Sequence, residues 1–61
     1  MNKPTVKLIG EDGNAFAILG KVSKALKKAG LTEEAKKYME EATSGDYNHL
    51  LAVTMEYVDV E

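Results

Sequence analysis

The chain's one histidine follows an aspartate and a serine in the segment SGDYNHLL, and these residue types could support catalysis. Asp46 and His49 are three residues apart, so on a helix the carboxylate could orient the imidazole. Ser44 would be the nucleophile of a Ser-His-Asp arrangement. Because Asp46 also suits a helix N-cap, we expect a cap beside an exposed or partner-contacting histidine. Glu40 and Glu41 could act as general acid and base, but they fit a solvated helix flank better. We therefore expect that the protein is not an enzyme.

The segment GEDGN, residues 10 to 14, is the second place where the residue types suggest a ligand. Glu11 and Asp12 would repel a phosphate, and neither glycine-rich phosphate motif is present. An EF-hand register would place a leucine at the first ligand position. With no cysteine and one histidine, most zinc sites are also excluded. We predict a structural turn with Asp12 or Asn14 capping a helix, and no cofactor or metal.

Lysines are concentrated in residues 20–37, where six lysines face two glutamates, whereas residues 38–61 hold six acidic residues and no basic one. Such a split favours self-association or docking onto a charged partner. Lys21, Lys24 and Lys28 share one flank of a predicted helix. A lysine stripe could also bind nucleic acid. The isoelectric point near 5.3, the lack of arginine and the lack of aromatic residues among the lysines make nucleic acid an unfavoured partner.

The apolar spacing predicts the elements that must position these side chains. Val6 and Leu8 alternate with polar residues as in a half-buried strand. The 3, 4 spacing that follows predicts a helix that ends at Gly30 and packs through Ala15, Ile18, Leu19, Val22, Ala25, Leu26 and Ala29. Phe16 lies on the other flank with Gly20, where it suits a second core contact or a helix-packing interface. Gly20 suggests a close approach to the backbone.

Two further helices and a strand are predicted after Gly30. Thr32 should cap a second helix whose buried positions are Ala35, Tyr38, Met39 and Ala42. Asp46, or alternatively Ser44, should cap a short third helix that buries Leu50, Leu51 and in part Tyr47. Alternation of Val58 and Val60 with polar residues predicts a strand from about Met55. One longer helix through Val58 is the alternative.

The predicted order is β-α-α-α-β, an α+β fold in which residues 1–61 form one domain and the two terminal strands pair in a small sheet packed on the helices. A chain of 61 residues without cysteine is near the lower limit for a self-sufficient core, so we expect a homodimer. Two small sheets could join at their edges. The candidate dimer residues are Ile9, Met55 and Tyr57. No membrane span or secretory signal is evident, and we expect a cytoplasmic protein.

The segments VKLIGEDGNAF, EATSGDYNHLL and EYVDVE together resemble a family of small uncharacterised proteins found in bacterial genomes and among phage genes. The resemblance runs from about Val6 to Glu61. It implies no activity, catalytic residue or ligand. The presence of phage proteins in that family favours the interpretation that this chain is a small regulator or inhibitor, which acts on a host complex by binding to it.

These observations favour a small protein-binding module over an enzyme. Its candidate partner-binding residues are Phe16, Lys21, Lys24, Lys28, Tyr38, Tyr47 and His49. The alternative is a small-ligand or nucleotide-binding dimer, with a pocket near Asn14, Tyr47 and Asn48. A nucleic-acid-binding protein is the third possibility.

Overall fold

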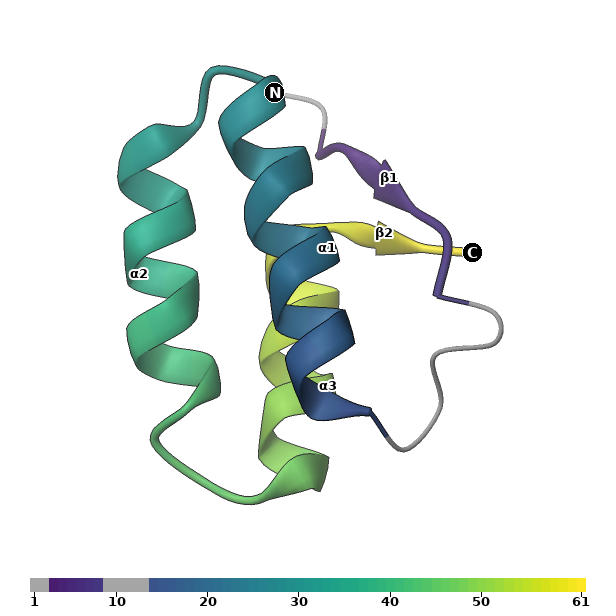
Figure 1. Cartoon of the computed structure of the whole chain (residues 1–61), viewed down its shortest axis with the longest axis vertical. Helices are drawn as coiled ribbons and strands as arrows, with labels where there is room; N and C mark the ends of the chain where they lie inside the picture. Colours follow the sequence, from purple (N-terminus) through teal and green to yellow (C-terminus); the bar gives the residue numbers. More distant parts are fainter. Residues whose placement is uncertain (1–2, 9–13) are drawn as a thin grey trace.

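The chain folds into three helices and a two-stranded sheet formed by its terminal segments (Figure 1). The computed structural model describes residues 3–8 and 14–61. In chain order the elements are strand β1 (Thr5–Val6), helix α1 (Ala15–Lys28), helix α2 (Thr32–Ala42), helix α3 (Tyr47–Tyr57) and strand β2 (Asp59–Val60). This order confirms the predicted β-α-α-α-β arrangement and the α+β fold class.

The two short strands are parallel neighbours. Parallel strands cannot be joined by a tight turn, and here all three helices lie in the connection between them. The backbone N–H of Leu8 donates to the carbonyl of Glu61 at 3.1 Å, which extends the pairing beyond the strand ends. The paired residues are Thr5 with Asp59 and Val6 with Val60.

Helix α1 has a side-chain cap at its start and a glycine stop at its end. Asn14 Oδ1 accepts from the backbone N–H of Ala17 at 3.1 Å, which confirms one of the two predicted caps. At the other end Gly30 has φ of 82°, a conformation that favours glycine. The backbone N–H of Leu31 then reaches the carbonyl of Leu26 at 2.8 Å, as in a Schellman motif. The predicted close approach at Gly20 is wrong, since a Cβ there would meet no atom within 4 Å.

Helix α2 differs from the prediction at two positions. Thr32 is its first helical residue rather than its cap, and Leu31 precedes it without a side-chain cap bond. Ala35, Tyr38 and Ala42 are buried as predicted, whereas Met39 is 38% exposed. The apolar face of α2 is therefore narrower than its residue types suggested.

Helix α3 begins as predicted and ends later than predicted. Asp46 Oδ1 accepts from the backbone N–H of His49 at 2.9 Å, which confirms Asp46 as the cap. The helix continues through Tyr57, and the backbone N–H of Val58 still donates to the carbonyl of Thr54 at 3.0 Å. A strand from Met55 is therefore wrong, because residues 55–57 are helical and β2 begins only at Asp59.

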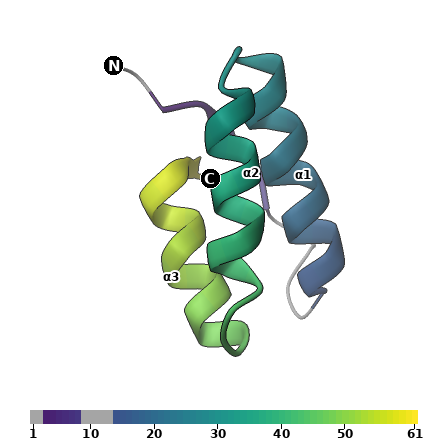
Figure 2. The same cartoon turned by 90° about the vertical axis from the view of Figure 1, so that its left-hand side faces the viewer.

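The three helices and the sheet form successive layers. In Figure 1 helix α2 lies on one side of α1 and α3, and the strands lie on the other. Figure 2 shows α2 in front of both neighbours. Among the described residues α2 packs on α1 and α3 but on neither strand, whereas β1 packs on α1 and β2 on α3. The middle layer is therefore covered on both sides.

The core lies between these layers. Its buried apolar residues are Val6, Leu8, Ile18, Leu19, Val22, Leu26, Ala35, Tyr38, Ala42, Leu50, Val53 and Val58. Val60 alternates with polar residues as Val58 does, but Val58 is buried and Val60 is 43% exposed. None of the described helices is both long and apolar enough to cross a membrane.

Candidate functional site

The corner between α2 and α3 brings the predicted serine and histidine together. His49 Nε2 lies 2.8 Å from the carbonyl oxygen of Glu41 and 3.2 Å from Ser44 Oγ. A carbonyl only accepts, so Nε2 must carry a hydrogen and donate it to Glu41. Ser44 Oγ in turn donates to the same carbonyl at 2.7 Å. With its proton in place, Nε2 has no lone pair with which to activate the serine.

Asp46 does not complete a catalytic arrangement either. Its carboxylate accepts from the backbone N–H of His49 as a helix cap. The geometry of His49 and Ser44 instead satisfies a carbonyl at the C-terminal end of α2, and Thr43 does the same by donating to the carbonyl of Met39 at 2.6 Å. Both carbonyls also accept from backbone N–H groups, Glu41 from Ser44 and Met39 from Thr43, each at 3.2 Å, so the side chains add further bonds at the helix end. These bonds hold the corner between α2 and α3 together, and the exposed imidazole of His49 is engaged within the chain.

A small apolar hollow lies where the start of α1, the end of α2 and the start of α3 meet. Its volume is about 260 Å³, and its lining residues are Ala15, Phe16, Leu19, Ala42, Thr43, Gly45, Asp46, Tyr47 and Leu50. Phe16 is 87% exposed, so it is not the second core contact suggested by the sequence. Tyr47 is 36% exposed. An apolar ring held in solvent beside a hollow is typical of interaction sites. We call this surface the Phe16 face.

The Phe16 face differs from the polar pocket predicted near Asn14, Tyr47 and Asn48. Only Tyr47 lines the hollow. Asn14 is engaged as the cap of α1, and Asn48 is exposed in the first turn of α3. Pockets for small molecules usually enclose roughly 300–1,000 Å³. An apolar hollow of about 260 Å³ suits one inserted side chain better than a nucleotide.

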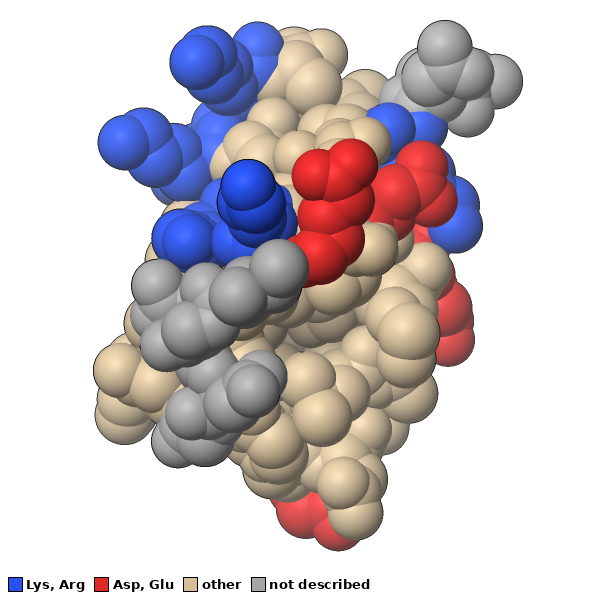
Figure 3. All heavy atoms as spheres, turned by 90° about the vertical axis from the view of Figure 1, so that its right-hand side faces the viewer, with Lys and Arg blue, Asp and Glu red and all other residues tan. Residues whose placement is uncertain are grey.

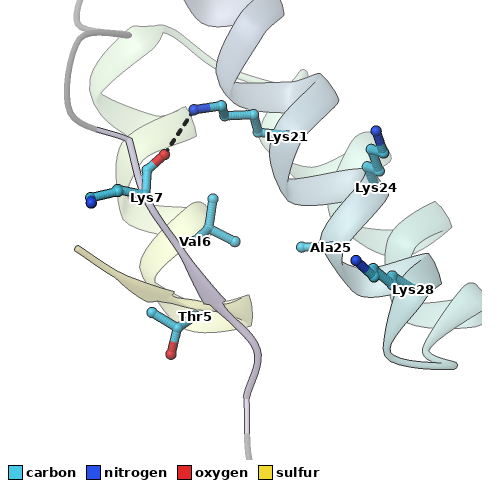
Figure 4. Close-up of a pocket in the computed structure, with 7 residues that line it drawn as sticks. All are labelled: Thr5, Val6, Lys7, Lys21, Lys24, Ala25 and Lys28. Carbon is cyan, nitrogen blue, oxygen red and sulfur yellow. Dashed lines mark hydrogen bonds between the residues drawn. The ribbon is translucent and has the colours of Figure 1, made fainter.

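The lysine-rich flank of α1 faces β1. Figure 3 shows a large group of lysine side chains at the left of the view, next to acidic side chains, and a smaller group at the right. Lys21, Lys24 and Lys28 line one wall of an open groove. The side chains of Val6 from β1 and Ala25 from α1 point toward each other across it (Figure 4). The structure therefore brings the three predicted lysines together.

Several predicted contact residues lie elsewhere. Tyr38 is wrong as a partner-binding residue, because it is 0% exposed and its hydroxyl is bonded inside the core. Met55 is 60% exposed and Tyr57 is half-buried, but both lie on α3 rather than on a strand edge. The third candidate dimer residue, Ile9, lies outside the described residues.

The GEDGN turn also falls largely outside the described part of the chain. Gly10, Glu11, Asp12 and Gly13 are not described, and only Asn14 of this segment is. Within residues 3–8 and 14–61, no group of three metal-binding side chains could hold a metal ion.

Tyr57 has an unusual electrostatic environment. Its hydroxyl donates to Glu41 Oε1 at 2.6 Å, so Glu41 is not the unengaged flank residue that the sequence suggested. The edge of one ring meets the face of the other where Tyr57 contacts Tyr38, with centroids 5.5 Å apart. The hydrogen bond to Glu41, and then burial and nearby carboxylates, raise the pKa of Tyr57 to about 12.

This hydrogen bond should make the folding stability of the protein fall at alkaline pH. The folded-state pKa of Tyr57 exceeds its usual value of 10.0. The stabilisation should therefore be complete below that usual value and be lost as the pH rises through the folded-state pKa. We expect an ultraviolet titration of tyrosinate to show a tyrosine with a pKa near 12, in addition to Tyr38, whose pKa is raised by burial. Glu41→Gln should lower that pKa, whereas Glu40→Gln should not. An unchanged titration in Glu41→Gln would contradict the assignment.

The fold and its surfaces define a small α+β protein with an apolar face at one end and a lysine-lined groove along α1. Comparison of the chain with protein-family models, with curated protein sequences and with solved structures finds no match.

The sequence analysis predicted some of the residues that form these two surfaces. Phe16, Tyr47 and three lysines of α1 were predicted as contact residues: Lys21, Lys24 and Lys28. Leu19, Ala42 and Leu50, which line the hollow, were assigned only to the core. They come from three different helices, so no spacing along the chain could have shown that they meet.

Proposed function

We propose that this protein is a small non-enzymatic protein-binding module whose Phe16 face receives an apolar side chain from a partner protein. The observation that carries the proposal is the 87% exposure of Phe16 beside the apolar hollow. Leaving a phenylalanine in water forgoes about 1.5–3 kcal/mol of burial free energy, which a partner could recover. Binding hot spots are typically aromatic residues at such positions.

The proposed mode of action is steric. The hydrogen bonds at the α2–α3 corner include that from Ser44 to Glu41, and they fix the helix ends that surround the hollow. A rigid face loses little conformational entropy when a partner binds. The resemblance to small phage proteins extends the proposal to the inhibition or regulation of a host complex in the cytoplasm, where a bound module would block another contact.

The homodimer is part of this proposal, on a surface away from the hollow. Met55 and Val60 are exposed apolar side chains near the C-terminal end of the chain, and a second copy could cover them. Light scattering should then give twice the monomer mass of 6.7 kDa. A mass of one monomer at micromolar concentration would contradict the dimer and leave the Phe16 face unaffected.

The test of the Phe16 face is capture from a host lysate with matched variants. We expect the tagged protein to retain a stoichiometric partner that Phe16→Ser loses, because hot-spot truncations cost about 2 kcal/mol or more. Met55→Ser, which removes another exposed apolar side chain, should retain it. Circular dichroism should show both variants folded. Equal capture by wild type and Phe16→Ser, or no captured partner, would overturn the proposal.

A further inference from the structure

A groove of about 450 Å³ runs between β1 and the C-terminal half of α1. Figure 4 shows β1 running alongside the helix, with Lys7 near Lys21 and Thr5 toward Lys28. One wall is thus a strand and the other a row of lysines. The groove shares no lining residue with the apolar hollow beside Phe16, so it is a second, separate surface.

The strand wall presents the outer edge of the sheet. The C-terminal segment bonds to alternate residues at and just before β1: the N–H of Asp59 donates to the carbonyl of Pro4 at 3.0 Å, and the N–H of Glu61 donates to the carbonyl of Val6 at 2.9 Å. In a parallel ladder the intervening residues direct their backbone groups to the opposite edge. For Lys7 this is observed, since its carbonyl accepts from Lys21 Nζ in the groove at 3.0 Å.

Such an edge is a template for an added strand. Thr5 and Lys7 supply the backbone groups that face the groove. Lysines at a sheet edge can also protect it from unwanted pairing. A strand with acidic side chains would be attracted to this edge, because its carboxylates would lie next to the lysines.

The lysine spacing matches an extended acidic segment. Lys24 and Lys28 are four residues apart, which corresponds to about 6 Å along a helix. Alternate side chains on one face of a strand are about 6.6 Å apart. In Figure 4 neither amino group is hydrogen-bonded to another residue drawn. Carboxylates at every second position could therefore reach both.

We propose that the outer edge of β1 binds an extended segment of a partner protein that carries Asp or Glu at every second position. Its main chain pairs with the carbonyl of Thr5 and the N–H of Lys7, because Lys21 already donates to the carbonyl of Lys7. Its carboxylates pair with Lys24 and Lys28. This proposal does not depend on the Phe16 face.

A second copy of this chain fits the groove less well. Pairing β1 with β1 of another copy would oppose two sets of lysines. Pairing β1 with β2 of another copy would be head-to-tail, which leaves an edge open on each molecule and does not close a dimer. Nucleic acid would leave the backbone groups of the strand edge unused, and the groove offers no arginine or aromatic side chain for bases.

The test uses a short labelled peptide in which glutamate and valine alternate, with binding measured by fluorescence anisotropy. Lys24→Gln combined with Lys28→Gln should weaken binding about tenfold, the effect expected when two exposed ion pairs are lost. Lys27→Gln combined with Lys36→Gln changes the net charge equally but lies outside the groove, and it should bind as the wild type does. Phe16→Ser should also leave this affinity unchanged.

Nuclear magnetic resonance locates the bound peptide. The amide signals of Thr5 and Lys7 should shift on binding, and a peptide with its glutamates in one block should bind more weakly. Four results would overturn the proposal: no binding, equal loss in the two double variants, equal affinity for the block peptide, or tighter binding of a single-stranded DNA oligonucleotide of equal charge. Light scattering that shows larger assemblies, which disperse when the peptide is added, would assign the edge to a second copy and overturn it too.

Discussion

Thr54→Val should lower the free energy of unfolding by about 1–3 kcal/mol, because it leaves a buried hydroxyl without a partner. Tyr38 and Thr54 are 0% and 1% exposed, and their hydroxyl oxygens lie 2.8 Å apart. Thr54 Oγ1 donates to the carbonyl of Leu50 at 2.8 Å, so it must accept from Tyr38. Burial raises the pKa of Tyr38, which keeps its phenol protonated as this donor.

Removing the donor as well should recover part of that loss. Tyr38→Phe alone should cost about 0.5–1.5 kcal/mol, since Thr54 keeps its bond to Leu50. In the double variant neither hydroxyl remains, so its cost should be smaller than the sum of the two single costs. Urea denaturation followed by circular dichroism measures all three. Additive costs would show that the two hydroxyls do not interact.

A surface threonine provides the control for this cycle. Thr32 is exposed, and the start of α2 shows no side-chain cap bond. Thr32→Val should therefore change the unfolding free energy by no more than about 0.5 kcal/mol. A loss comparable with that of Thr54→Val would mean that Thr32 does cap α2, as its sequence position suggested.

The Tyr38–Thr54 pair shows where sequence reasoning stopped. Apolar spacing placed Tyr38 in the buried stripe of α2, yet its residue type also made it a candidate contact residue. Its partner lies 16 residues away on another helix. Thr54 is polar, so its residue type does not mark it as buried, although it falls at helical spacing between Leu50 and Val58. Spacing predicts which face of a helix is buried, whereas buried polar pairs depend on how helices meet.

The boundary between α3 and β2 was predicted wrongly for a different reason. Alternation in MEYVDVE fits a strand, but Val58 also follows Thr54 at helical spacing. In the structure Val58 is 1% exposed and its N–H continues the helical bonding, so the strand begins only at Asp59. Short apolar segments satisfy both periodicities, and the pairing with β1 decides between them.

Gly45→Ala should destabilise the protein by about 1–3 kcal/mol, the usual cost of forcing an extra carbon into a packed region. A Cβ on Gly45 would lie 2.7 Å from His49 Cγ, 2.8 Å from Cδ2 and 2.9 Å from Cβ. These atoms are close to the His49 backbone, so a small rotation of the ring tip cannot relieve the clash. The imidazole would have to leave the carbonyl of Glu41, and α2 would lose that C-terminal bond.

Gly20→Ala is the matched control and should have the opposite sign. The same carbon added at Gly20 meets nothing within 4 Å, and alanine is favoured over glycine in a helix interior by about 1 kcal/mol. Combining Gly45→Ala with His49→Ala should cost less than the sum of the two single changes, since the ring that clashes is gone. Thermal and urea unfolding measure these signs. A Gly45→Ala variant as stable as the wild type, with the His49 ring signals unshifted in nuclear magnetic resonance spectra, would show that this corner is loosely packed. The hollow beside Phe16 would then lack the rigid rim on which steric binding depends.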